Sequence, residues 1–218
     1  MSDRLDFDLS KLEPPQRYKL LIGLVVPRPI ALVTTVSKTG VVNTAPYSFF
    51  NMFSENPPLV VIGVDARDDG SMKDSARNAR DTGVFVVNLV DEALAVAMND
   101  CSVDFPPEVS ETGTLGLPTR PGIHVPVPHL ADAPAALECR KMMMINIGPN
   151  RELLIGEVLG VRARGGIVDP ATLRVDFDAY KPVGRLAGSL YARQHDRFAL
   201  KRQSFEEWKR SNGGKVGD

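Results

Sequence analysis

Residues 43–51, Asn43-Thr44-Ala45-Pro46-Tyr47-Ser48-Phe49-Phe50-Asn51, carry the strongest signal of the fold. They follow a β-branched run at 30–36, precede another at 59–64, and place a proline among small polar and aromatic side chains. Pro46 has no N–H for a sheet ladder, so a strand here must be an edge, bulged or interrupted. An interrupted strand leaves backbone polar groups free for a flat, polar-edged ligand such as an isoalloxazine ring. A bent core strand without a ligand, which occurs in many β proteins, also explains these residues.

Length and composition bound the class of protein. The chain has 218 residues, 43% of them hydrophobic and 24% charged, which fits one soluble globular domain with appendages. Lys and Arg number 26 against 27 Asp and Glu, so no basic excess points to nucleic acid or an anionic membrane. The N-terminus lacks an apolar secretory core, and no apolar run reaches the roughly 18 residues of a membrane span. We therefore expect a cytoplasmic protein.

The potential metal ligands are sparse. Cys101 and Cys139 lie far apart without a CxxC spacing, so we expect two reduced thiols. His124 and His129 are five residues apart in a proline-containing stretch, which predicts an extended loop rather than a helical ligand pair. We expect no metal site.

The remaining pattern predicts mostly hairpin-joined strands with a few helices. Helices are expected over 14–23, 71–82 and 91–99, and a long loop over 100–130. Strands are expected over 30–36, 41–50, 59–64, 84–90, 135–147 and 152–164, with a tight turn at 38–40. Such an order favours an antiparallel barrel with peripheral helices over a doubly wound sheet. We expect a lead-in over 1–13, one domain over 14–200 and a helical tail over 201–218.

A second segment, residues 67–78, suits an anion. Neither GxGxxG nor GxxxxGK[ST] occurs, so Rossmann and P-loop interpretations have no support. Gly70 permits a sharp turn, Ser71 suits a helix cap, and Lys73 and Ser75 add a charge and a hydroxyl to the free N–H groups of a first helical turn. Ser71 with Asp74 also fits a capping box that needs no ligand. One FMN molecule needs both a ring site and a phosphate site.

These segments, in this order, resemble the flavin reductase-like family of FMN-binding split-barrel proteins. The matching stretches are 27–35, 43–51, 73–78, 85–90 and 184–193. The resemblance implies a mainly β fold with peripheral helices, built on a six-stranded antiparallel Greek-key split barrel. It also implies a homodimer with FMN near the interface.

The resemblance also implies site residues. Residues 44–50 are expected along the flavin ring, largely through backbone groups, and the 71–78 stretch at the phosphate and ribityl chain. Asp74 would repel a phosphate, so we expect it to cap the helix or orient Lys73. No catalytic residue is obligatory, and Tyr191, Arg193 and His195 are candidates for the substrate side. The full set of cofactor-binding candidates is Arg28, Thr34, Thr35, Asn43, Thr44, Ala45, Tyr47, Ser48, Phe49, Phe50, Asn51, Ser71, Lys73, Ser75 and Asn78.

The predicted function is that of an FMN flavoprotein oxidoreductase, with FAD as a possible substitute. In the first alternative, an NAD(P)H-dependent flavin reductase, a nicotinamide gives hydride to the flavin. In the second, a non-enzymatic FMN electron carrier is reduced by a partner protein. A hydrolase is disfavoured because Gly188-Ser189-Leu190 lacks the GxSxG elbow, and a purely structural barrel stays open. A monooxygenase or electron-transfer protein is the expected partner.

Overall fold

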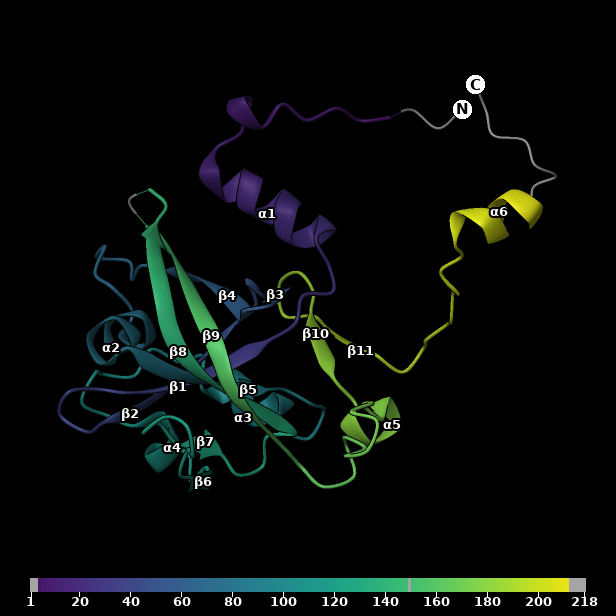
Figure 1. The fold of residues 1–218 in the computed structure, drawn as a ribbon. Coiled ribbons are helices and arrows are strands. Elements are labelled where there is room, and N and C mark those ends of the chain that lie inside the picture. The colour runs from purple at the N-terminus through teal and green to yellow at the C-terminus, as the bar shows by residue number, and fades with distance from the viewer. Residues whose placement is uncertain (1–3, 149, 212–218) are drawn as a thin grey trace.

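The structure, a computed structural model, describes residues 4–148 and 150–211 (Figure 1). The helices are η1 Leu9–Lys11, α1 Pro14–Leu24, α2 Asp74–Thr82, α3 Ala95–Asp100, α4 Glu111–Thr114, α5 Phe177–Tyr180 and α6 Phe205–Ser211. The strands are β1 Ala31–Val36, β2 Val42–Tyr47, β3 Phe50–Glu55, β4 Pro58–Asp65, β5 Val84–Leu89, β6 Thr119–Arg120, β7 His129–Leu130, β8 Ala135–Asn146, β9 Arg151–Ala163, β10 Val183–Arg185 and β11 Tyr191–Arg193.

The main sheet is antiparallel, in the order β2-β1-β5-β8-β9-β4-β3. It has seven strands, so the expected six-stranded barrel is wrong in its strand count. The additional strand is β3, which pairs with β4. Ser48 and Phe49, which belong to no strand, separate β3 from β2. Residues 51–55 lack β-branched side chains, and their pairing with β4, across the two-residue connection Asn56-Pro57, makes them a strand.

The break in strand pairing also closes the barrel. β2 and β3 lie at opposite edges of the sheet, yet only Ser48 and Phe49 separate them in the chain. The two edges must therefore approach each other at these two residues. A hydrogen bond of 2.7 Å from the Gly63 N–H to the Phe49 carbonyl fixes the crossing on β4. The segment that we singled out in the sequence thus lies at the split between the two edges.

The first hairpin is confirmed. β1 pairs with β2 from Ala31 opposite Tyr47 to Val36 opposite Val42, across a turn in which Gly40 has a φ of 87°. Pro46 lies opposite Leu32 in β2, which is an edge strand, as a residue without an N–H requires. The predicted long strands are likewise present as β8 and β9, and the helix over 14–23 is present as α1.

The barrel interior is apolar. Buried side chains from β1, β4, β5 and β9 fill it, with Phe85, Ile62 and Leu154 among the largest. Gly156 on β9 makes room for the Phe85 ring, because a Cβ there would lie 2.3 Å from Phe85 Cζ. α2 covers one end of the barrel through Ala76 and Ala79 and ends at Gly83, whose φ is 78°.

The start of α2 differs from the prediction. The helix begins at Asp74 rather than Ser71, and Lys73 occupies its N-cap position. Ser71 instead lies in a turn: its carbonyl accepts from the Arg67 N–H at 2.8 Å and its N–H donates to Asp69 Oδ1 at 2.8 Å. The capping box of Ser71 with Asp74 does not form, because Asp74 is paired with Arg67 and Arg77.

Other segments follow the sequence pattern in part. The helix expected over 91–99 begins at Ala95, after Asp91 Oδ1 accepts the Leu94 N–H at 3.0 Å. The loop expected over 100–130 contains α4, β6 and β7. α6 lies apart from the barrel (Figure 1), inside the predicted tail. Residues 1–3 of the predicted lead-in, residue 149 of the turn before β9 and residues 212–218 of the tail lie outside the described residues.

Cys101 and Cys139 are both free thiols and both buried. Within residues 4–148 and 150–211, no helix combines the length and hydropathy needed to cross a bilayer.

Candidate functional site

Residues 43–51 border three adjoining cavities. We call them the helix cavity, of about 120 Å³, the central cavity, of about 300 Å³, and the apolar cavity, of about 570 Å³. Pro46 and Tyr47 lie in the walls of the first two, and Ser48 lies in the walls of the last two. Neighbouring cavities therefore share wall residues at or beside the crossing between β2 and β3, and we refer to the three cavities together as the hollow.

The helix cavity lies at the start of α2. Its lining comprises Asn43, Ala45, Pro46, Tyr47, Arg67, Lys73, Asp74, Ser75, Cys101, Ser102, Val103, Asp104, Phe105 and Glu111. Lys73 is half-buried, and within the described part of the chain no carboxylate forms an ion pair with it. Ser75 is buried and its hydroxyl accepts from Asn43 Nδ2 at 2.8 Å. The first N–H groups of α2 have no partner within the helix, so this cavity offers donors and a cation to an anion.

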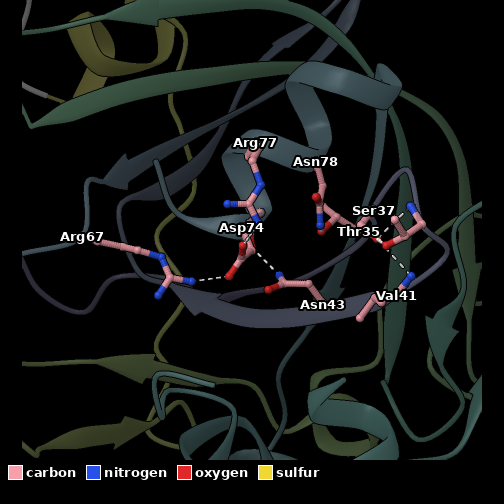
Figure 2. Close-up of polar contacts among 10 residues, drawn as sticks. Thr35, Ser37, Val41, Asn43, Arg67, Asp74, Arg77 and Asn78 are labelled. Atoms are coloured by element: carbon pink, nitrogen blue, oxygen red, sulfur yellow. Dashed lines mark hydrogen bonds and ion pairs between the residues drawn. The ribbon is translucent and has the colours of Figure 1, made fainter. Parts of the chain in front are cut away.

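Charges in the helix cavity are balanced within the chain. Asp74 is buried between Arg67 and Arg77 and bonds to both guanidinium groups, as Figure 2 shows. Asp104 and Glu111 add two further carboxyl groups to the lining. Burial raises the pKa of Glu111, and the Thr44 N–H, which donates to Glu111 Oε2 at 2.8 Å, opposes that shift only in part. An anion here must share the cavity with carboxylates.

Tyr47 has an unmatched polar atom at the boundary of two cavities. Its side chain is buried, its hydroxyl has no hydrogen-bond partner among the described residues, and it lines both the helix and central cavities. Burial raises the pKa of Tyr47 to about 12, so it stays a neutral donor at physiological pH. A buried hydroxyl without a partner is costly, and a ligand atom in the adjoining space would relieve that cost.

The apolar cavity has aromatic and aliphatic walls. It is lined by Leu21, Ile22, Val25, Pro27, Arg28, Pro29, Ser48, Phe49, Phe50, Asn51, Phe53, Val61, Gly63, Arg151, Leu153 and Ile155. Gly63 lets Phe49 lie against β4, since a Cβ at that position would be 3.1 Å from Phe49 Cβ. The Arg151 guanidinium lies 4.8 Å from the Phe49 ring centroid. Such a wall suits one face or edge of a planar ring.

The central cavity is polar and holds two arginines. Its lining is Tyr18, Ile22, Arg28, Ile30, Pro46, Tyr47, Ser48, Met98, Asn99, Ser102, Arg185, Leu186, Gly188 and Tyr191. Arg28 is buried and donates to the carbonyls of Ile22, Val25 and Leu186 at 2.7–2.8 Å. Arg185 donates to the Tyr191 hydroxyl and to the Gly188 carbonyl.

Several predicted cofactor residues point into the protein interior. The Thr34 hydroxyl donates to the Pro128 carbonyl at 2.7 Å, and Thr35 Oγ1 accepts from Asn78 Nδ2 at 3.1 Å (Figure 2). Thr44 Oγ1 is buried without a partner among the described residues, while its N–H is bonded to Glu111. None of these threonines belongs to the lining of the three cavities. Asn78 lines a separate cavity together with Lys38 and Asp81.

The other predicted residues divide between the hollow and the surface. Asn43, Ala45, Tyr47, Ser48, Phe49, Phe50, Asn51, Lys73, Ser75, Arg28 and Tyr191 line one or more of the three cavities. Ser71 is exposed and lies outside all three linings. Arg193 and His195 are exposed and both pair with Glu92, and neither belongs to a lining.

The structure adds residues that the sequence analysis did not select. Arg67 lay inside the quoted 67–78 segment, but nothing there indicated that it pairs with Asp74. Glu111 had no signal, because it comes from the long loop and reaches Thr44 by tertiary contact. Arg185 lies in the late stretch of the family resemblance, next to the selected Tyr191. Within the described residues, no group of three or more His, Cys, Asp or Glu side chains is placed to hold a metal ion.

Comparisons with known proteins agree with this fold. The sequence profile of the flavin reductase like domain matches residues 23–184. The 2-nitrobenzoate 2-nitroreductase NbaA of Pseudomonas fluorescens is 39% identical, with a TM-score of 0.85 over 92% of this chain and 98% of that one. Nitrilotriacetate monooxygenase component B of Bacillus cereus is 35% identical, with a TM-score of 0.88 over 92% and 100%.

A split-barrel protein of Shewanella frigidimarina is similar in fold, at 19% identity and a TM-score of 0.77, over 90% of this chain and 96% of that one. The seven-stranded sheet that closes at Ser48 and Phe49 is thus a split barrel. With the profile matching most of the sequence, the chain belongs to the flavin reductase-like family.

Proposed function

We propose that this chain binds FMN along residues 43–51 and acts as an FMN-dependent oxidoreductase that takes hydride from NADH or NADPH. The observation that carries the proposal is this hollow, which combines a donor-rich end, formed by Lys73 and the start of α2, with an aromatic end. A flavin mononucleotide has the same two parts, a phosphate and a tricyclic ring. Family membership supports it, and the names of NbaA and component B denote a reductase and a monooxygenase component.

The residues present fit the cofactor. Lys73, Ser75 and the first turn of α2 would hold the phosphate, and the Tyr47 hydroxyl would gain the partner that it lacks. Ser48 and the backbone of the crossing would face the polar edge of the ring, with Phe49 and Phe50 beside it. FMN, when bound, supplies the group that accepts hydride and passes electrons onward. The chain's own task is to orient that group, to exclude water from part of it and to leave one side open.

We further propose that two copies of the chain pair over the apolar cavity. Large hydrophobic side chains near it are exposed, among them Leu21, Met52 and Phe53. Exposed apolar surface of this kind is typical of protein interfaces. A homodimer would cover the aromatic end of the hollow, and a monooxygenase or electron-transfer protein would then receive the electrons. Light scattering of the purified protein measures the mass and tests the pairing.

The decisive experiment is spectroscopic. The protein, purified or mixed with FMN, should be yellow and should bleach within seconds when NADH or NADPH is added without oxygen. A protein that binds FMN but is bleached only by a reduced partner protein would be an electron carrier. A colourless protein that ignores added FMN would contradict the proposal.

A variant of the phosphate end sharpens that test. Lys73→Ala should weaken FMN binding by about tenfold or more, because a charge-assisted contact is lost. Riboflavin, which lacks the phosphate, should bind the variant and the wild type equally. Lys38→Ala is the matched control, since Lys38 pairs with Asp81 at 3.5 Å and lies outside the three cavities. Unchanged FMN binding in Lys73→Ala would place the phosphate elsewhere.

A further inference from the structure

Arg28 and Arg185 face each other across a short antiparallel bridge. The Arg28 N–H donates to the Arg185 carbonyl at 3.0 Å, and the Arg185 N–H donates back at 2.8 Å. Residues directly opposite in such a pair project their side chains from the same face, and like charges in that arrangement are destabilising. Both arginines accordingly belong to the lining of one space, the central cavity.

Neither arginine has a carboxylate partner among the described residues. Arg28 donates to three backbone carbonyls and, at 3.5 Å, to Ser48 Oγ. Arg185 bonds to a hydroxyl and a carbonyl and lies with its guanidinium carbon 4.5 Å from the Tyr191 ring centroid. A guanidinium group has five N–H donors, so Arg185 retains donors for a further acceptor.

The lining of the central cavity contains two arginines and no Asp or Glu. Burial lowers the pKa of Arg28 from its ordinary value, with Arg185 acting in the same direction and Tyr18 opposing it. A guanidinium group stays charged at neutral pH in proteins. Two uncompensated positive charges beside one cavity favour an anionic occupant.

The shape and the other walls narrow the class of anion. The cavity has about 300 Å³ and three tyrosines in its walls, Tyr18, Tyr47 and Tyr191. Aromatic walls favour a planar apolar body, and the planar fork of Arg185 matches the two oxygens of a carboxylate. A whole dinucleotide is larger than this space, whereas a single substituted benzene ring fits the usual scale of a small ligand pocket.

We propose that the central cavity binds the carboxylate of an aromatic acid through Arg185, with the charge of Arg28 adding to the attraction. Ser48 and Tyr47 place this ligand beside the crossing that the proposed FMN also borders. If the proposed function holds, aromatic carboxylic acids are the substrate class. The binding site itself consists of this chain's own residues and does not depend on the flavin.

The test is a ligand-observed NMR titration of the full chain with benzoate, and with benzamide as its neutral counterpart, both without FMN and with FMN added. Benzoate should bind and benzamide should bind at least about tenfold more weakly, because only the carboxylate meets the charge. Equal binding of the two, or no binding of benzoate, would overturn the proposal. A colourless protein that still prefers benzoate would remove the proposed flavin function and leave this site standing.

Variants assign the site to its residues. Arg185→Gln should abolish the preference for benzoate, and Arg185→Lys should retain it at lower affinity if the glutamine variant fails to fold. Arg193→Gln is the matched control, an arginine of the same hairpin that pairs with Glu92 at 2.8 Å and lies outside the cavity. A preference that survives in Arg185→Gln, or disappears in Arg193→Gln, would overturn the assignment.

The phosphate of FMN is the competing occupant. For this arm the affinities of FMN and riboflavin are compared in the wild type and in Arg185→Gln. The ratio of the two affinities should be the same in both proteins if the phosphate lies in the helix cavity. A loss of FMN affinity alone, with riboflavin unaffected, would show that Arg185 holds the phosphate and would overturn the proposal.

Discussion

The helix cavity and the central cavity both contain arginines, but they stabilise them differently. At the helix cavity, Asp74 bonds to Arg67, which lines the cavity, and to Arg77, which does not, so the arginine in the lining has a carboxylate partner inside the protein. In the central cavity, Arg28 and Arg185 meet only carbonyls and hydroxyls, which bond to the guanidinium groups without cancelling their charge.

This difference separates structural from ligand-binding roles for the same residue type. A neutral acceptor satisfies the N–H groups of a buried arginine but leaves the field of its charge in the cavity. A carboxylate accepts from the N–H groups and also cancels the charge, so it competes with any incoming anion. The helix cavity should bind an anion through Lys73 against internal competition, whereas the central cavity should attract one without it.

The largest expected effect comes from removing Arg28. Arg28→Ala leaves the carbonyls of Ile22, Val25 and Leu186 without their donor and detaches the end of α1 from the β10 region. Losing several buried charge-assisted bonds should lower the free energy of unfolding by about 3 kcal/mol or more. Urea unfolding monitored by circular dichroism measures it.

The control for this variant is an arginine within α1 itself. Arg17 is exposed and donates to the Leu12 carbonyl at 2.7 Å, so Arg17→Ala should change stability far less. If Arg28→Ala unfolds at the wild-type urea concentration, then water or other donors satisfy the three carbonyls. In that case the central cavity is not the rigid arrangement that the comparison assumes.

The second prediction concerns the ion pairs of Asp74, whose removal should change the stability and the FMN affinity in opposite directions. Asp74→Asn should lower the free energy of unfolding by about 2 to 3 kcal/mol, since Asp74 is buried and bonds to two guanidinium groups. The same change removes a negative charge from the helix cavity and frees Arg67, so the affinity for FMN should rise several-fold.

Asp81→Asn is the matched control at the other end of α2, where Asp81 pairs with Lys38 and Arg80 outside the three cavities. It should leave FMN affinity unchanged. Chemical unfolding and a fluorescence titration with FMN measure the two quantities. If Asp74→Asn weakens both stability and FMN binding, then Asp74 orders the phosphate site instead of competing with the phosphate.

The local parts of the fold could be predicted from the sequence. The β-branched run of β1, the turn at Gly40 and the missing N–H of Pro46 define the hairpin and its edge strand without distant information. β3 could not be predicted, because residues 51–55 have weak strand propensity and become a strand only by pairing with β4. The position of Asp74 likewise depends on Arg67, whose approach follows from the turn at Ser71.

The candidate site was predictable as a segment and less so as side chains. Residues 43–51 do border the three cavities, yet Thr44 turns inward, because alternate residues of a strand face opposite sides. The sequence did not predict that Arg28 and Arg185 lie opposite each other, since this requires a bridge between distant parts of the chain. The contact between Glu111 and Thr44 could not be predicted for the same reason.

The smallest effect is expected at Glu111 and depends on pH. Burial raises the pKa of Glu111 in the folded protein, whereas in the unfolded chain a glutamate has a pKa of about 4.3. The folded state therefore holds its proton to higher pH than the unfolded state. Ionisation of Glu111 costs stability as the pH rises from about 4.3 through the folded pKa, and the full cost is present above that value. Below about 4.3 the cost is absent.

Glu111→Gln removes the ionisation and keeps an oxygen that can accept the Thr44 N–H. The variant should unfold like the wild type at acid pH and become relatively more stable towards pH 7, as measured by thermal melting of both proteins at each pH. Glu92→Gln is a control of opposite sign, because Arg193 and then His195 lower the pKa of Glu92. The Glu92 variant should be less stable than the wild type at neutral pH, and this difference should vanish as the pH falls. If the Glu111 variant instead loses stability at neutral pH, then the carboxylate is stabilised in the folded state, and the helix cavity carries a full negative charge beside Thr44.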